Sequence, residues 1–219
     1  MSVRYTLTIG TKDWSSWSLR PYMALRAIGV PFEEDVIALR RNSTTAEVQK
    51  RTPAGRVPVL KIEDGDARYV VWDSLAICET LAERHPAATL WPEDAVSRAQ
   101  ARAYSAEMHS GFPDVRDQLT MDFARRLSLP ELRDETKKQI ARIVDAWTSA
   151  LERNSAGGEF LFGRFSIADC MYAPVVSRFV TYGVPLPPLA KTYVERVFAL
   201  PAMQDWGKAA QQEIDAGLA

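Results

Sequence analysis

The 219-residue sequence contains few of the side chains that hold metals or form disulfides. It has two cysteines, Cys78 and Cys170, and two histidines, His85 and His109. The cysteines lie far apart in apolar helical contexts, which predicts buried, reduced thiols. Possible metal ligands do not recur at the spacing of a metal site, so we predict that the protein holds no metal.

The sequence also lacks an excess of charge of either sign and a long apolar run. A formal net charge of −1 gives no overall field that would attract nucleic acid or an anionic membrane. No stretch approaches the roughly 18 apolar residues of a membrane span, and the first residues lack the apolar segment of a signal peptide. We therefore expect a cytoplasmic protein that binds neither nucleic acid nor membrane.

The motifs of several enzyme classes are missing as well. A serine hydrolase would need a Gly-x-Ser-x-Gly turn, and only the two histidines could serve as its base. A glycine-rich phosphate loop followed by Lys is absent. A thiol-disulfide oxidoreductase needs a cysteine at the first turn of its first helix, where this sequence has serine.

The first 85 residues follow the pattern β-α-β-α-β-β-α. We expect strands near residues 4–9, 32–39, 58–62 and 68–72, and helices near residues 16–29, 44–51 and 74–85. The first two strands are joined by a helical crossover and should be parallel, whereas the tight acidic turn at residues 63–66 should make the last two antiparallel. This order predicts a thioredoxin-like domain over residues 1–85.

The segment Asp13 to Pro21 contains Ser15, Ser16 and Trp17 and lies at the turn between the first strand and the first helix. Such a turn directs free backbone N–H groups and one or two hydroxyls beyond the end of a sheet. An anion there would meet hydrogen-bond donors and the positive end of a helix dipole. Considered alone, however, the two serines are more typical of a simple helix cap.

Two further motifs follow in the same domain. Pro58 opens a strand in the interior of the pattern, so its bond to Val57 is either trans at a sheet edge or cis, with the Val57 backbone turned outward to pair with an extended peptide. Asp73-Ser74 is typical of a helix N-cap. The same pair also suits an amino-acid head group, because the hydroxyl can meet a carboxylate and the Asp an ammonium.

Together, the segments Ser15–Arg20, Arg56–Leu60 and Asp73-Ser74 resemble the soluble glutathione S-transferases, and most closely the serine-dependent bacterial members related to the zeta class. The resemblance implies that glutathione is the cosubstrate and that Ser15, or alternatively Ser16, is the partner of its thiolate. It also implies further glutathione contacts, which are Trp17, Arg56, Val57, Pro58, Asp73, Ser74 and, for the glycyl end, Arg41 or alternatively Arg40. Trp17 occupies the position of the cysteine in the zeta Ser-Ser-Cys pattern.

The second half of the sequence has helical periodicity almost throughout. After a linker at residues 86–93, we expect an all-helical domain over residues 94–219, with a helix from Asp94 that kinks at Pro113 and continues, and another from Pro130 to Asn154. Ser166 and Asp169 form a capping box for a central helix. By resemblance, Met108, Phe112 and Phe123 would line the pocket for the electrophile, although such residues are equally typical of a core.

The resemblance implies that the protein stabilises the glutathione thiolate through a serine hydroxyl and adds it to a small electrophile. Isomerisation, dehalogenation and peroxide reduction use the same thiolate and stay open as alternatives. A further alternative is a protein of this fold that binds glutathione or another ligand without turnover. The family further implies a homodimer.

Overall fold

The computed structural model describes residues 3–52 and 54–219 and contains a four-stranded sheet near the N-terminus. The strands are β1 (Arg4–Gly10), β2 (Glu33–Ile37), β3 (Val59–Asp64) and β4 (Ala67–Val71), in the order β2-β1-β3-β4. β1 and β2 pair in parallel, whereas β3 runs antiparallel to both β1 and β4. The predicted thioredoxin-like order and strand directions are confirmed.

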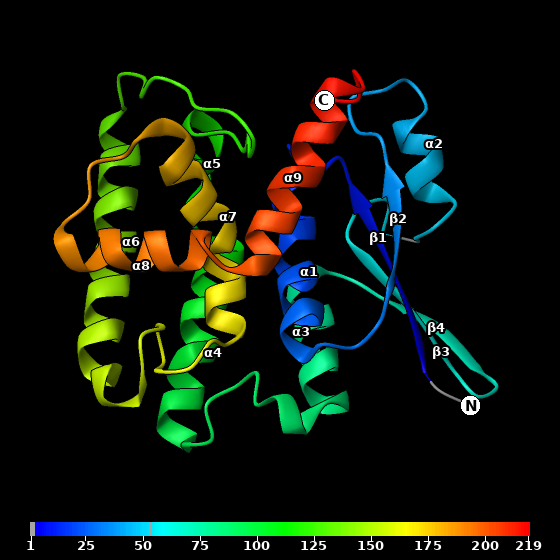
Figure 1. The fold of residues 1–219 in the computed structure, drawn as a ribbon, viewed down its shortest axis with the longest axis horizontal. Coiled ribbons are helices and arrows are strands. Elements are labelled where there is room, and N and C mark those ends of the chain that lie inside the picture. Colours follow the sequence, from blue (N-terminus) through cyan, green and yellow to red (C-terminus); the bar gives the residue numbers. More distant parts are fainter. Residues whose placement is uncertain (1–2, 53) are drawn as a thin grey trace.

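Three helices accompany the sheet, namely α1 (Ser16–Ile28), α2 (Thr44–Gln49) and α3 (Ser74–Arg84). α1 lies between the sheet and the second domain (Figure 1). Its side chains from Ser18 to Leu25 are buried, because the helix packs against α3 on one side and α7 (Ile167–Tyr182) on the other. The helix ends at Gly29, whose φ of 76° is a left-handed conformation that glycine adopts without steric cost.

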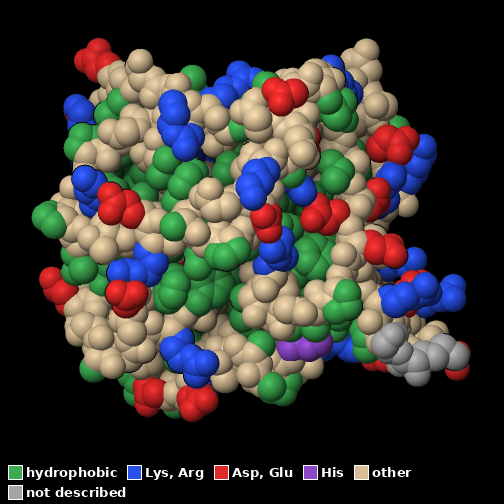
Figure 2. Space-filling view, viewed as in Figure 1, with side chains coloured by type: hydrophobic (Ala, Val, Ile, Leu, Met, Phe, Trp, Pro, Cys, Tyr) green, Lys and Arg blue, Asp and Glu red, His purple; other side chains and the backbone are tan. Residues whose placement is uncertain are grey.

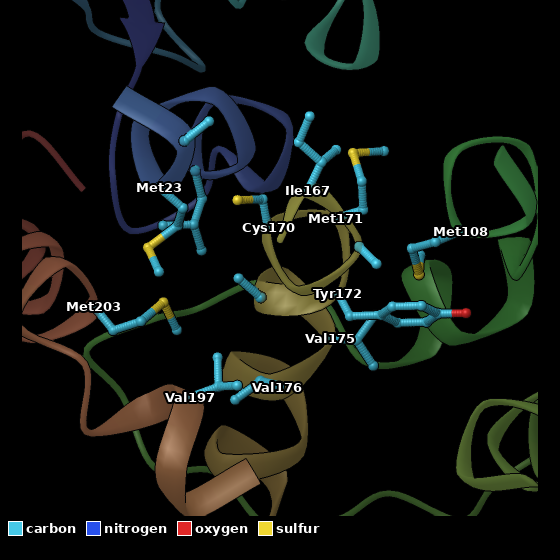
Figure 3. Close-up of a cluster of buried hydrophobic side chains, with 14 of the residues drawn as sticks. Met23, Met108, Ile167, Cys170, Met171, Tyr172, Val175, Val176, Val197 and Met203 are labelled. Carbon is cyan, nitrogen blue, oxygen red and sulfur yellow. The ribbon is translucent and has the colours of Figure 1, made fainter. Parts of the chain in front are cut away.

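The second domain is helical and follows a short 3-10 turn at Pro86–Ala88. Its helices besides α7 are α4 (Ala95–Ser110), α5 (Pro113–Gln118), α6 (Asp134–Asn154), α8 (Pro188–Phe198) and α9 (Pro201–Asp215), with a 3-10 turn at Ser155–Gly157. α7 runs through the middle of the core, and its Cys170, Met171, Tyr172 and Val175 face side chains of neighbouring helices (Figure 3). The Ser166–Asp169 capping box forms as predicted.

Two of the expected helix boundaries are wrong. The helix from Asp94 does not kink and continue, but ends at Ser110, because Gly111 is extended and Phe112 is left-handed with φ 59°. A Cβ at Gly111 would lie 2.7 Å from the Glu107 carbonyl oxygen, so only glycine fits this exit. The next long helix begins at Asp134 rather than Pro130, since the Arg133 N–H bonds the Gln118 side chain and two acidic residues fill the first turn.

Acidic and basic side chains are intermingled over the face shown in Figure 2, in keeping with the small net charge. Among the described helices, none is long and apolar enough to cross a membrane. The C-terminal helix α9 lies beside α1 and ends near β2 (Figure 1), so the end of the chain returns to the first domain.

Candidate functional site

The turn between β1 and α1 holds Ser15 at the N-cap of α1. Its side chain is buried, and its hydroxyl lies 2.7 Å from the Ser18 hydroxyl, which accepts a hydrogen bond from the Gly10 N–H at 3.2 Å. No side chain caps α1. The first N–H groups of this helix therefore lack a side-chain partner, and an anion at the turn would be stabilised by them.

A cavity of about 500 Å³ lies next to this turn. Its walls come from both domains: the start of α1, the segment before β3, the start of α3 and the end of α4. The lining residues are Trp17, Ala54, Arg56, Val57, Pro58, Trp72, Asp73 and His109. The cavity has the size of a typical small-molecule site, and it brings together five of the predicted glutathione contacts.

Asp73 and Ser74 lie at the N-terminus of α3. Asp73 caps the helix, with Oδ1 accepting the Leu75 N–H at 3.1 Å, while its Oδ2 lies 3.0 Å from His109 Nε2. Its side chain is half exposed toward the cavity, whereas Ser74 is fully buried. The prediction of an N-cap at this pair is confirmed, and the cap leaves the carboxylate accessible.

The segment before β3 forms the opposite wall. The Val57–Pro58 bond is cis, as in the second of the two sequence-based alternatives, and the Trp72–Asp73 bond is also cis. Val57 precedes the first ladder pair of β3, which joins Val59 to Thr8, so its backbone lies outside the sheet. Arg56 is exposed beside it and lines the same cavity.

Trp17, which lines the cavity, contacts two guanidinium groups. The Arg20 and Arg116 guanidinium carbons lie 4.2 Å and 5.0 Å from the Trp17 ring centroid. Arg20 is almost completely buried, and its Nη1 donates to the Ser74 hydroxyl at 3.5 Å. Burial, together with Arg116 and Arg178, lowers the pKa of Arg20 to about 9, so this group is still cationic at neutral pH.

The other predicted residues lie outside the cavity lining, and three of them, Ser15, Ser16 and Ser74, lie at the starts of α1 and α3 beside it. Arg41 donates from Nη2 to the Gly217 carbonyl at 2.5 Å, and Phe123 stacks on Phe198 beside another hollow. Met108 points into the core near Tyr172 (Figure 3), and Phe112 is buried at the N-cap of α5. The α4 wall is formed instead by His109, because successive helical side chains point about 100° apart.

The predictions from the sequence did not place Trp72, Ala54, His109 or the arginines that contact Trp17 in the site. Trp72 directly precedes Asp73, the predicted N-cap, so its position in the sequence could have placed it beside the site. The contact of His109 with Asp73 had no such signal, since it joins residues from different domains.

The described residues offer neither a metal site nor a reactive cysteine. No group of three or more His, Cys, Asp or Glu residues in residues 3–52 and 54–219 is placed to hold a metal ion. Both cysteines are free and fully buried, and burial raises the pKa of the Cys78 thiol to about 12. Neither thiol is therefore ionised at neutral pH.

A thioredoxin-like domain followed by a helical domain, with a cavity between the cis-proline segment, the first helix and the third, defines the architecture of the soluble glutathione transferases. Comparison with known proteins supports the same family. The N-terminal domain of the glutathione S-transferases matches residues 14–84, and their C-terminal domain matches residues 130–217. The chain therefore belongs to the glutathione S-transferase family.

Individual relatives indicate which branches it resembles. Maleylacetoacetate isomerase from Mus musculus is 31% identical over 180 residues, covering 79% of this chain and 77% of the mouse protein. A glutathione transferase homologue from Burkholderia gl BGR1, solved with bound glutathione, has a TM-score of 0.71 and 25% identity, covering 95% of this chain and 99% of its own. Maleylacetoacetate isomerase from Anaeromyxobacter dehalogenans, also solved with glutathione, has a TM-score of 0.68 and 26% identity, covering 94% and 95%.

Proposed function

We propose that this protein binds glutathione in the cavity between its two domains and adds the glutathione thiolate to a small electrophile. The observation that carries the proposal is the convergence of Trp17, Arg56, Val57-Pro58 and Asp73 on one cavity beside the uncapped start of α1. Two structural relatives that were solved with bound glutathione support the choice of ligand.

The cavity offers a partner for each part of the tripeptide. Asp73 would bind the γ-glutamyl ammonium, and the buried Ser74 hydroxyl, which already accepts from Arg20, has its own hydrogen free for the carboxylate. The Val57 backbone would pair with the cysteinyl residue, as an added strand pairs with a sheet edge. Arg56 is an exposed cation that lines the same cavity and suits a carboxylate of the ligand.

Catalysis in this proposal consists of stabilising one charge. A free thiol with a pKa near 8.5 is only a few per cent ionised at neutral pH. A hydrogen bond from the Ser15 hydroxyl, the first N–H groups of α1 and the buried Arg20 cation would all favour the thiolate. The sulfur then attacks the electrophilic carbon, forms a C–S bond and expels the leaving group with its electron pair.

A second candidate function is glutathione-dependent cis-trans isomerisation, which the names of the mouse and Anaeromyxobacter relatives favour. In that reaction the thiolate adds to a double bond, rotation follows, and the same thiolate leaves. Glutathione is consumed in a transfer reaction but is regenerated in an isomerisation. Trp17, which occupies the position of the zeta cysteine, favours transfer.

The test combines binding with the fate of glutathione. The purified protein should be retained on immobilised glutathione and should turn over an aryl halide with one glutathione consumed per product. Turnover of maleylacetoacetate without loss of glutathione would assign the isomerase function instead. Retention without turnover of aryl halides, maleylacetoacetate, haloalkanes or peroxides would indicate a binding protein, and failure to bind glutathione would refute the proposal.

A further inference from the structure

His109 is the point at which the helical domain touches the acidic anchor of the first domain. It lies in the last turn of α4, and its Nε2 is 3.0 Å from Asp73 Oδ2 at the start of α3. The side chain of His109 is only 24% exposed, and it lines the cavity together with Asp73. The contact therefore forms one edge of the site proposed for glutathione.

The position of the imidazole is fixed from several directions. Its edge packs on Trp17 of α1, with ring centroids 5.2 Å apart and planes at 83°. The His109 carbonyl accepts a hydrogen bond from Arg116 Nη2 of α5 at 3.1 Å. A ring held by contacts to Trp17 and Asp73, on a backbone that is itself bonded to α5, loses little side-chain entropy when a ligand binds beside it.

The two nitrogens of His109 have unequal roles. Nε2 faces a carboxylate, so it carries the hydrogen and donates. Nδ1 is buried and has no partner among the described residues. With Nε2 engaged and Nδ1 inaccessible, neither nitrogen is free to take a proton from a thiol in the cavity, which argues against a role as the general base.

The hydrogen bond from His109 fixes the orientation of the Asp73 carboxylate. One oxygen of this carboxylate is fixed by the Leu75 N–H and the other by His109, so the plane of the group is set before any ligand arrives. An ionised carboxylate has about four acceptor positions, so each oxygen keeps one for a further donor. An ammonium group placed in the cavity would meet a carboxylate that needs no reorientation.

We propose that His109 is a positioning residue that holds the Asp73 carboxylate toward the α-ammonium group of bound glutathione. This inference rests on the proposed glutathione site. It assigns to the helical domain a part in recognising the γ-glutamyl end, because the contact between α4 and α3 fixes the acid that the thioredoxin-like domain supplies.

The test compares two ligands by titration calorimetry on the full-length protein. The ligands are glutathione and glutaryl-Cys-Gly, which is the same tripeptide with hydrogen in place of the α-amino group. His109→Phe keeps an aromatic edge for Trp17 and removes the donor, whereas His109→Gln restores an N–H at about the reach of Nε2. His85→Phe is the matched control, since His85 pairs with Tyr5 at the other end of α3.

We expect His109→Phe to weaken glutathione binding about tenfold, in line with the loss of one hydrogen bond to a charged group. Binding of glutaryl-Cys-Gly should change less than about twofold, and His109→Gln should recover most of the affinity for glutathione. His85→Phe should leave both affinities unchanged.

Equal weakening of both ligands by His109→Phe, or no change in either, would overturn the inference while leaving the glutathione site intact. If wild-type protein bound neither ligand, the proposed function itself would be refuted, and the positioning role with it. The two failures are therefore distinguished by the wild-type titration alone.

Discussion

Ser15 is linked to the end of β1 through a short series of hydrogen bonds. The Gly10 N–H donates to the Ser18 hydroxyl, which lies 2.7 Å from the Ser15 hydroxyl. When Ser18 donates to Ser15, the Ser15 hydrogen is free to point toward a bound sulfur. Hydrogen bonds in such a series polarise one another, which strengthens the last donor.

Replacement of Ser15 by alanine should therefore lower kcat/KM roughly 10- to 100-fold, the range expected for a hydrogen bond to a charged group. The absorbance of the bound glutathione thiolate near neutral pH should fall in parallel, as measured by ultraviolet difference spectroscopy. Ser16→Ala is the control and should change both quantities little. Unchanged ionisation in both variants would exclude Ser15 and Ser16 as the donor to the thiolate.

The role of Asp73 can be separated from its capping function, because Asn caps a helix about as well as Asp. Asp73→Asn should leave the melting temperature nearly unchanged and should weaken glutathione binding about tenfold, since the charge opposite the ammonium is lost. Calorimetric titration and a thermal melt measure the two effects. A large fall in melting temperature with unchanged affinity would assign Asp73 a structural role only.

At the scale of the element, α7 depends on the group that caps it. Asp169 is fully buried and accepts four hydrogen bonds, from the Leu161 and Ser166 N–H groups and from the Ser166 and Tyr193 hydroxyls. Burial nevertheless outweighs these bonds and raises its pKa from 3.8 to about 6. The carboxylate is thus well bonded but costly to ionise.

The sign of the resulting pH dependence follows from these values. The folded protein binds a proton at Asp169 more readily than the unfolded chain, so this residue's contribution to stability is largest below about pH 4 and is lost as pH rises through about 6. The difference between these two pKa values corresponds to about 3 kcal/mol in the free energy of unfolding. The stability difference between wild type and Asp169→Asn, measured by urea unfolding, should therefore be smaller at pH 7 than at pH 4.5.

At the scale of the whole molecule, the turn that carries Ser15 is bonded to the C-terminal helix α9. The Trp206 indole N–H donates to the Lys12 carbonyl at 2.9 Å, and the Asp13 N–H donates to Glu213 at 3.2 Å. The Asp13 carbonyl and side chain accept the N–H groups of Phe123 and Ala124. The geometry at the start of α1 is thus set by both domains.

Loss of one of these ties should destabilise the protein and disturb the site together. Trp206→Phe keeps most of the buried ring but leaves the Lys12 carbonyl without its indole donor, at a cost of about 1–3 kcal/mol. Amide exchange should increase in both β1 and α9, as measured by hydrogen-exchange mass spectrometry. Increased exchange confined to α9 would show that the turn is held independently.

The homodimer expected from the family resemblance stays a prediction. Light scattering at micromolar concentration should give about twice the chain mass of 24.5 kDa. A mass equal to one chain would rule out a stable dimer under those conditions.

The local patterns of the sequence determined most of the elements. Alternation, helical periodicity and turn residues predicted the succession of strands and helices along the first domain, the Asp73 cap and the Ser166–Asp169 capping box, because each depends on neighbours within a few residues. The end of α4 at Ser110 escaped prediction, since the apolar spacing continues past Gly111 while the backbone does not.

The tertiary structure alone decided which side chains share the cavity. Met108 and His109 are adjacent in sequence, yet one faces the core and the other faces Asp73, because the rotation of α4 is fixed by its packing on α7. Arg41 donates to the Gly217 carbonyl near the C-terminus and does not line the cavity. Arg20 of α1 contacts Trp17 and donates to Ser74 of α3, while Arg116 of α5 contacts the same Trp17 ring. Such contacts join distant residues, so their geometry depends on how whole elements pack and cannot be read from local spacing.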